Sequence, residues 1–115
     1  MNELPQSLDY DSRIPGHRYL HRSRLQYIVK MVSKAVSVIR QAGNKDDIRL
    51  VEVGCGDGHV LREVGTKFPK LSLTGIDLNQ TRLTRAKRLV PEASIISGDA
   101  LKMPFNSGAF TIVVL

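Results

Sequence analysis

The sequence lacks several features that would assign it to a particular class of protein. It has no tryptophan, and aromatic residues make up 5% of its 115 residues, which disfavours a protein that binds single-stranded nucleic acid by stacking. Its single cysteine, Cys55, excludes a disulfide within the chain. No apolar run reaches the ~18 residues of a membrane-spanning helix, and the acidic N-terminus has no apolar segment typical of a secretory signal. These absences predict a globular protein of the reducing cytoplasm.

Positive charge is concentrated in the first part of the chain. The net charge is +6, and residues 1–45 hold eight lysines and arginines against three acidic residues. Such a segment can meet phosphate, an anionic lipid or RNA, or it can be an ordinary solvated helix surface. Residues 1–21 show no sustained periodicity and contain Pro5, Pro15 and Gly16, so we expect an N-terminal arm there, followed by one domain over 22–115.

Beyond position 21, helical and strand-like spacings of apolar residues alternate. Gly43 and Asn44 provide a left-handed stop for the first helix. The alternation predicts an α/β fold, a Rossmann-like, doubly wound parallel sheet of about four strands in three layers, with a helix before the first strand. The spacing and the β-rich runs predict helices at 22–42, 60–68 and 80–90 and strands at 49–53, 71–76, 94–97 and 110–115.

Three glycines follow the first predicted strand in the segment VEVGCGDG: Gly54, Gly56 and Gly58. Glycines permit a positive φ and remove the Cβ that would collide with a ligand, and the next helix presents free N–H groups there. A dinucleotide site needs G-x-G-x-x-G, but His59 replaces the last glycine. The Glu52 carboxylate would repel a pyrophosphate and could accept from an ammonium group. The turn therefore favours an amino-acid-bearing nucleoside over NAD or FAD.

Two further carboxylates end the next two predicted strands. Asp77 is placed where a carboxylate can accept from both hydroxyls of a ribose, and Leu78 after it can lie against a purine. Asp99 can accept from an exocyclic amine, while the N–H of Ala100 or Leu101 can donate to a ring nitrogen. Because the carboxyl ends of neighbouring parallel strands meet in one crevice, we expect these groups to form one site.

The segments VEVGCGDG, GIDLN and SGDALKMPFNSGAFTIVVL together resemble class I S-adenosylmethionine-dependent methyltransferases, particularly the small-molecule enzymes of the ubiquinone and menaquinone type. The resemblance covers about residues 49–115. It implies methyl transfer from S-adenosylmethionine to a small-molecule acceptor, without a metal ion, and it identifies no catalytic residue or general base. The cofactor-binding residues that it implies are Glu52, Gly54, Cys55, Gly56, Gly58, Asp77, Leu78, Asp99 and Ala100.

The sequence departs from this family in two respects. It reads Phe110-Thr111 where such proteins usually have Phe-Asp, and it holds four predicted strands of the family's seven. The four would lie side by side in the order 3-2-1-4, which leaves the fourth strand as an open edge for a second copy or a partner chain. We therefore expect the cofactor-binding half of an enzyme. The alternative is a non-catalytic module that binds cofactor or a partner, and an RNA methyltransferase or an NAD-binding protein is less favoured.

Overall fold

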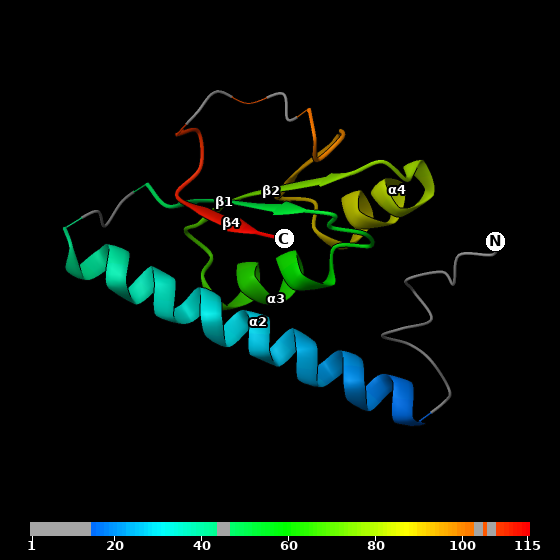
Figure 1. The fold of residues 1–115 in the computed structure, drawn as a ribbon, viewed down its shortest axis with the longest axis horizontal. Helices are drawn as coiled ribbons and strands as arrows, with labels where there is room; N and C mark the ends of the chain where they lie inside the picture. Colours follow the sequence, from blue (N-terminus) through cyan, green and yellow to red (C-terminus); the bar gives the residue numbers. More distant parts are fainter. Residues whose placement is uncertain (1–14, 44–46, 103–104, 106–107) are drawn as a thin grey trace.

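A computed structural model describes residues 15–43, 47–102, 105 and 108–115, so most of the predicted arm, residues 1–14, lies outside the described residues. Helices and strands alternate along the described chain (Figure 1). The elements are α2 (Pro15–Gln41), β1 (Arg49–Val53), α3 (His59–Lys67), β2 (Ser72–Asp77), α4 (Gln80–Leu89), β3 (Ser94–Ser97) and β4 (Ile112–Val114).

The four strands form one parallel sheet in the order β3-β2-β1-β4. This confirms the predicted strand order and the Rossmann-like fold. Strand β1 is central, and its Leu50 and Val51 are fully buried. Glu52 pairs in register with Gly75 of β2 and with Val114 of β4. The sheet therefore places Glu52 between two neighbouring strands rather than at an edge.

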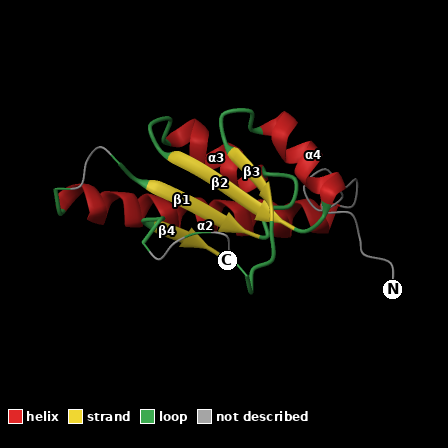
Figure 2. Cartoon of the chain, turned by 90° about the horizontal axis from the view of Figure 1, so that it is seen from above, coloured by secondary structure: helices red, strands yellow, loops and turns green. Residues whose placement is uncertain are grey.

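The helices cover one face of the sheet, so the prediction of three layers is wrong for the described residues. Two right-handed crossovers that run in the same direction place α3 and α4 on the same face, and α2 packs against α3. Figure 2 shows the strands in front and the helices behind them. The connection from β3 to β4 reverses direction, and its described residues form no helix. The described fold therefore has two layers.

The first helix is longer than its apolar stripe predicted. It begins at Pro15, which corrects the expectation of an irregular arm for residues 15–21. Proline is tolerated in the first helical turn, because the N–H that it lacks has no partner there. The end agrees with the prediction, since Gly43 adopts a φ of 95° and its N–H donates to the Arg40 carbonyl at 3.1 Å. Apolar residues of α2, among them Val32 and Val36, are buried in the core.

Candidate functional site

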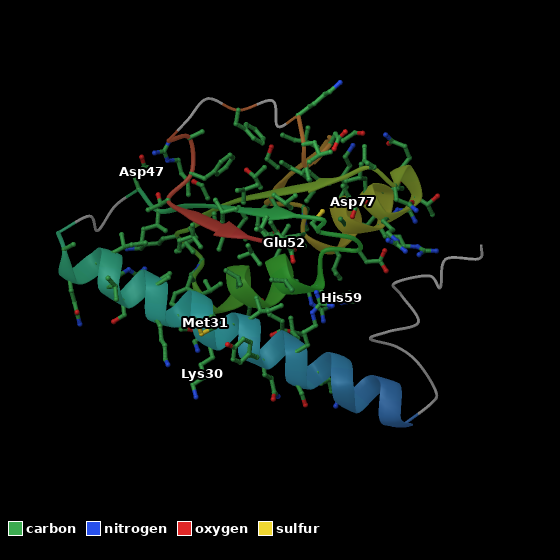
Figure 3. All side chains as sticks on the ribbon, viewed as in Figure 1. Lys30, Met31, Asp47, Glu52, His59 and Asp77 are labelled. Carbon is green, nitrogen blue, oxygen red and sulfur yellow. The ribbon has the colours of Figure 1, made fainter. Side chains whose placement is uncertain are left out.

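The predicted site residues come together at one edge of the sheet. Because all four strands are parallel, their carboxyl ends lie on the same side. The glycine turn follows β1, Asp77 ends β2, and Asp99 follows β3. In Figure 3, Glu52, His59 and Asp77 lie toward this end, while Asp47 lies at the opposite end. The fold thus brings segments that are distant in sequence to a common edge.

The glycine turn folds back onto β2. Gly54, Gly56 and Gly58 have φ values of 77°, 55° and 91°, as their sequence positions led us to expect. The N–H groups of Gly54 and Cys55 both donate to the Ile76 carbonyl, at 2.7 and 3.0 Å. These two hydrogen bonds hold the turn against β2, and the path of the turn requires a positive φ at three positions, which glycine adopts without strain.

Two of these glycines are required for different physical reasons. A Cβ on Gly58 would lie 3.2–3.3 Å from atoms of Val90 and Ala86, so Gly58 allows the start of α3 to pack closely on α4. A Cβ on Gly54 would meet nothing within 4 Å, and Gly54 is exposed. Internal packing therefore does not explain Gly54, whose bare backbone borders open space at the strand ends.

The Asp77 carboxylate joins the glycine turn to the end of β2. Its Oδ2 accepts from the Gly56 N–H, and its Oδ1 accepts from the Asn79 N–H, each at 2.9 Å. Asp77 is half-buried, and each oxygen keeps a further lone pair. Asp77 thus has a structural role that the sequence did not reveal, and its remaining lone pairs can still accept from a ligand.

Glu52 is a buried carboxylate with one oxygen that no described residue pairs. It is 7% exposed, and its Oε1 has no hydrogen-bond partner among the described residues. Burial raises the pKa of Glu52 from 4.5 to about 8, and the charge of Asp77 adds to this effect, whereas the Arg24 guanidinium of α2 opposes it. A buried group in this condition is stabilised when a cation binds beside it. Nothing in the sequence pattern indicated Arg24, which lies off the apolar stripe of its helix.

The side chains of Cys55 and Asp57 are buried against other parts of the protein. Burial, with the nearby charges of Glu52 and Asp77, raises the pKa of the Cys55 thiol to about 12, so this thiol is unreactive at neutral pH. Its Sγ lies close to the position that a Cβ on Gly75 would take, which leaves only the Cys55 backbone to face a ligand. Asp57 is buried, with Arg85 of α4 3.8 Å from its Oδ1, and the N-cap of α3 is Gly58 without a side-chain cap.

An exposed leucine follows each of the carboxylates at the ends of β2 and β3, Asp77 and Asp99. Asp99 Oδ1 accepts from the Leu101 N–H at 2.9 Å, so this N–H is already used within the protein, whereas the N–H of Ala100 forms no hydrogen bond that we observe among the described residues. Leu78 is 66% exposed and Leu101 is 91% exposed. Leu101, which lies within the turn closed by the Lys102 N–H and the Asp99 carbonyl, was not predicted as an apolar contact. Pro104, in the segment that carried the resemblance, lies outside the described residues.

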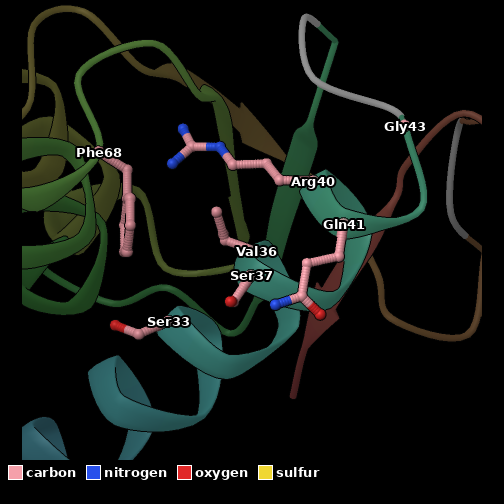
Figure 4. Close-up of a pocket in the computed structure, with 7 residues that line it drawn as sticks. All are labelled: Ser33, Val36, Ser37, Arg40, Gln41, Gly43 and Phe68. Carbon is pink, nitrogen blue, oxygen red and sulfur yellow. The ribbon is translucent and has the colours of Figure 1, made fainter.

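Two hollows lie away from the carboxyl ends of the strands. One, of about 720 Å³, lies between the end of α2 and Phe68 (Figure 4), and another, of about 740 Å³, lies between α2 and α3. The described residues contain no group of three His, Cys, Asp or Glu side chains that could hold a metal ion. Within the same part of the chain, no helix has the length and apolar character needed to cross a membrane.

Comparison with known sequences matches more than half of the chain to one protein family. Residues 50–115 match the family described as "Methyltransferase domain". Cycloartenol-C-24-methyltransferase 1 of Oryza sativa subsp. japonica is 37% identical over 79 residues, which are 64% of this chain and 23% of that protein. A malonyl-[acyl-carrier protein] O-methyltransferase of Legionella pneumophila is 34% identical over 68 residues, 56% of this chain and 24% of that protein. The chain thus spans about a quarter of these relatives' length.

Solved structures show the same fold at low sequence identity. The plantazolicin methyltransferase BpumL, in complex with a substrate analogue and SAH, has a TM-score of 0.62 and 16% identity, over 95% of this chain and 44% of that chain. Geranyl diphosphate C-methyltransferase from Streptomyces coelicolor A3(2) has a TM-score of 0.54 and 23% identity, over 59% of this chain and 26% of that chain. At these identities, the likeness supports the arrangement of the strands and helices.

Proposed function

The chain belongs to the class I S-adenosylmethionine-dependent methyltransferase family, and from this membership we propose that its strand-end site binds S-adenosylmethionine as part of a methyltransferase. The observation that carries the proposal is the buried carboxylate of Glu52, whose Oε1 has no partner among the described residues, two positions before the open backbone of Gly54. The methionine end of the cofactor bears an ammonium group that would pair with this carboxylate. A dinucleotide would instead bring a pyrophosphate, and so a like charge, to the same place.

The other predicted residues supply complementary groups for the rest of the cofactor. The free lone pairs of Asp77 would accept from the ribose hydroxyls, while Gly54 lets the ligand approach the backbone. Leu78 and Leu101 offer exposed apolar surface for the adenine ring, and the Ala100 N–H offers a donor. Asp99 would accept from the exocyclic amine through lone pairs that Leu101 does not use. In this arrangement Cys55 and Gly56 contribute backbone only, and Gly58 contributes by packing α3 against α4.

The bound cofactor supplies a methyl group already activated by its sulfonium charge. The protein's residues therefore act by holding and orienting the cofactor and by restricting water, and none of the described residues is assigned as a general base. For the acceptor, we propose a small molecule. Three of the similar proteins carry names that refer to cycloartenol, malonyl-[acyl-carrier protein] and geranyl diphosphate, which are small or carrier-bound organic acceptors.

Calorimetric titration with S-adenosylhomocysteine tests the cofactor site when two glycine variants are compared. Gly54 and Gly43 both adopt a positive φ, and a Cβ on either meets nothing within 4 Å. Alanine at either position therefore introduces similar backbone strain, roughly 1–2 kcal/mol. Only Gly54→Ala places a methyl group where the cofactor would lie. We expect the wild-type chain and Gly43→Ala to bind, and Gly54→Ala to lose at least tenfold in affinity.

Two results would contradict the proposal. The first is a wild-type chain that is folded by circular dichroism and does not bind S-adenosylhomocysteine. The second is equal loss of affinity in Gly54→Ala and Gly43→Ala, which would trace the effect to stability rather than to contact. Titration of the same samples with NADH separates the alternative ligand class, because a dinucleotide site would bind NADH in preference to S-adenosylhomocysteine.

A further inference from the structure

The helices of this fold carry charge of almost one sign. The α2 helix has six lysines and arginines and no acidic residue, and α4 has four and none. A cation in the last turn of a helix is stabilised by the helix dipole, which explains Arg40 and Lys67. It does not explain Lys30 in the middle of α2 or Arg62 near the start of α3. The helical layer therefore presents a positive surface beyond what its helix termini require.

Three hollows follow one another along α2 and α3. The hollow of about 740 Å³ between these helices shares Ser33 with the hollow of about 720 Å³ beside Phe68. A third, of about 590 Å³, shares Arg40 and Phe68 with the second and Lys67 with the first. Because they share lining residues, the three form one continuous groove, which we call the α2–α3 groove. From Arg22 to Arg40 it follows α2 for about 27 Å.

The α2–α3 groove combines apolar and basic side chains. Leu25, Val29 and Phe68 are half-buried and pack against the core, so each keeps some apolar surface that a ligand can cover. Among the described residues that line the groove, Glu63 is the one acid, and its Oε1 lies 3.9 Å from Arg62. The lysines and arginines that line it, most of them exposed, are Arg22, Lys30, Arg40, Arg62, Lys67 and Lys70.

Phe68 brings together two of these cations from separate helices. The Arg40 guanidinium of α2 lies 5.8 Å from the centroid of its ring, and the Lys67 ammonium group of α3 lies 5.9 Å from it, both within the range of a cation–π contact. Figure 4 shows Arg40 extending from α2 toward Phe68. Two like charges held near one ring favour an anionic group beside them. The middle of the groove is therefore prepared for a ligand that is both apolar and negative.

We propose that the α2–α3 groove binds an acidic amphipathic helix of another protein. This interaction goes beyond the proposed function, because it concerns the helices and not the strand-end site. The apolar face of such a helix would cover Leu25, Val29 and Phe68, and carboxylates beside that face would meet the lysines and arginines. A partner helix of about 18 residues, or about five turns, matches the length of the groove.

Other occupants satisfy only part of this arrangement. A second copy of the chain is disfavoured by charge, because none of the described helices carries an excess of acidic residues. A nucleic-acid backbone would pair with the cations but would leave the apolar side chains uncovered. A flat lipid surface would meet the exposed lysines and arginines but would not enter a groove.

Fluorescence anisotropy with two labelled peptides of identical composition tests the proposal. Both have about 18 residues rich in leucine and glutamate. In the first, the leucines recur at helical spacing and form one apolar face, and in the second they are distributed around the helix. We expect the wild-type chain to bind the first peptide at least tenfold more tightly than the second. A single-stranded RNA of similar length and vesicles of phosphatidylcholine and phosphatidylserine probe the other occupants.

Matched charge reversals locate the binding surface. Arg40→Glu and Lys67→Glu each place an acid in the last turn of a helix that borders the groove. Lys87→Glu and Arg88→Glu do the same in the last turn of α4, outside the groove, so the cost to the helix terminus is similar in all four. We expect the first two to lower the affinity for the amphipathic peptide at least fivefold each, and the α4 variants to bind like the wild type.

Four results would overturn the proposal. A wild-type chain that is folded by circular dichroism and binds neither peptide would reject it, as would equal affinity for both peptides. Equal losses in the groove and α4 variants would show a general effect of charge. Tighter binding of the RNA or the vesicles than of the amphipathic peptide would assign the surface to that occupant instead. Where a reversal unfolds the chain, glutamine at the same four positions gives the same comparison.

Discussion

The Gly56 N–H donates to Asp77 Oδ2 at 2.9 Å and thereby ties the turn after β1 to the end of β2. The other oxygen of the same carboxylate accepts from the Asn79 N–H, just before α4. One side chain therefore links two loops at the carboxyl ends of the strands. A residue predicted to contact ribose thus also supports these loops from within the protein.

This double role predicts that Asp77→Ala will destabilise the chain as well as weaken cofactor binding. Two hydrogen bonds to a charged acceptor are lost, and we expect the free energy of unfolding to fall by roughly 1.5–3 kcal/mol. Urea unfolding in the absence of ligand measures this. If Asp77→Ala unfolds like the wild type and yet fails to bind S-adenosylhomocysteine, Asp77 acts on the ligand alone and the supporting role is wrong.

Because of Glu52, we expect the stability of the folded chain to fall as pH rises. Its pKa is about 8 in the folded chain, against the ordinary value of 4.5 that we expect in the unfolded chain. Between these pH values the folded chain binds more protons than the unfolded chain, so acid stabilises the fold. The difference corresponds to roughly 4–5 kcal/mol at most, fully lost above pH 8. Thermal unfolding of Glu52→Gln from pH 4 to 9 should show a flatter profile and a more stable chain at pH 8 than the wild type.

The exposed Glu63 of α3 provides the control for this series. Glu63→Gln removes the same charge, and its profile should follow that of the wild type. A slope that persists in Glu52→Gln would mean that another group produces the pH dependence.

The same carboxyl predicts proton release when the cofactor binds. At pH 7 Glu52 is largely protonated in the chain without ligand, because its pKa is about 8. An ammonium group beside it favours the ionised form, so binding should release close to one proton. Titration with S-adenosylhomocysteine in phosphate and in Tris, whose ionisation enthalpies differ, measures this number. Release should vanish at pH 9, where Glu52 is already ionised, and release that is equal at pH 7 and pH 9 would exclude Glu52 as its source.

The strand order and the glycine turn could be predicted because local patterns determine them. Alternating apolar runs identify the strands, and the consecutive crossovers leave few arrangements. Positive φ values at Gly54, Gly56 and Gly58 follow from residues that tolerate them. The carboxyl ends of parallel strands then bring Glu52 and Asp77 to one edge without knowledge of any contact.

Other features depend on tertiary contacts that a pattern does not contain. The number of layers depends on whether the β3–β4 connection forms a helix, and its described residues do not. The start of α2 depends on whether Pro15 begins or breaks a helix, and both fit its sequence. The effect of Arg24 on Glu52 joins residues 28 positions apart, and the dual role of Asp77 depends on the exact path of the glycine turn.

Among the described residues, β4 pairs on one side only, and this edge leads us to expect self-association of the 115-residue chain. Strand β4 pairs with β1 on one side, and Val113 is 53% exposed. An unpaired edge with apolar side chains can add another strand, so light scattering should show a mass that rises with concentration, and Val113→Lys should suppress this. Val38→Lys is the matched control, because Val38 is also exposed but lies on α2. A wild type that stays monomeric at every concentration, or an equal effect of Val38→Lys, would reject pairing through this edge.

Of the methyl groups that a substitution could add near the site, we expect one at Gly75 to disturb the packing most. A Cβ at this position of β2 would lie 2.7 Å from Leu61 Cδ1 and 2.9 Å from Cys55 Sγ, and both neighbours are buried. Gly75→Ala should therefore lower the free energy of unfolding by roughly 1–3 kcal/mol and weaken cofactor binding, because Cys55 must shift within the glycine turn. Urea unfolding and S-adenosylhomocysteine titration measure the two effects.

Gly65→Ala is the comparison that isolates this cause. Gly65 lies inside α3, where a Cβ would meet the flexible end of Leu73 at 3.0 Å and alanine gains about 1 kcal/mol in helix propensity. The two terms oppose each other, so we expect a change in stability smaller than that of Gly75→Ala, and unchanged cofactor affinity because the glycine turn is not displaced. If both variants lose affinity equally, general destabilisation explains the loss. If Gly75→Ala binds like the wild type, contact between β2 and Cys55 does not control the shape of the turn.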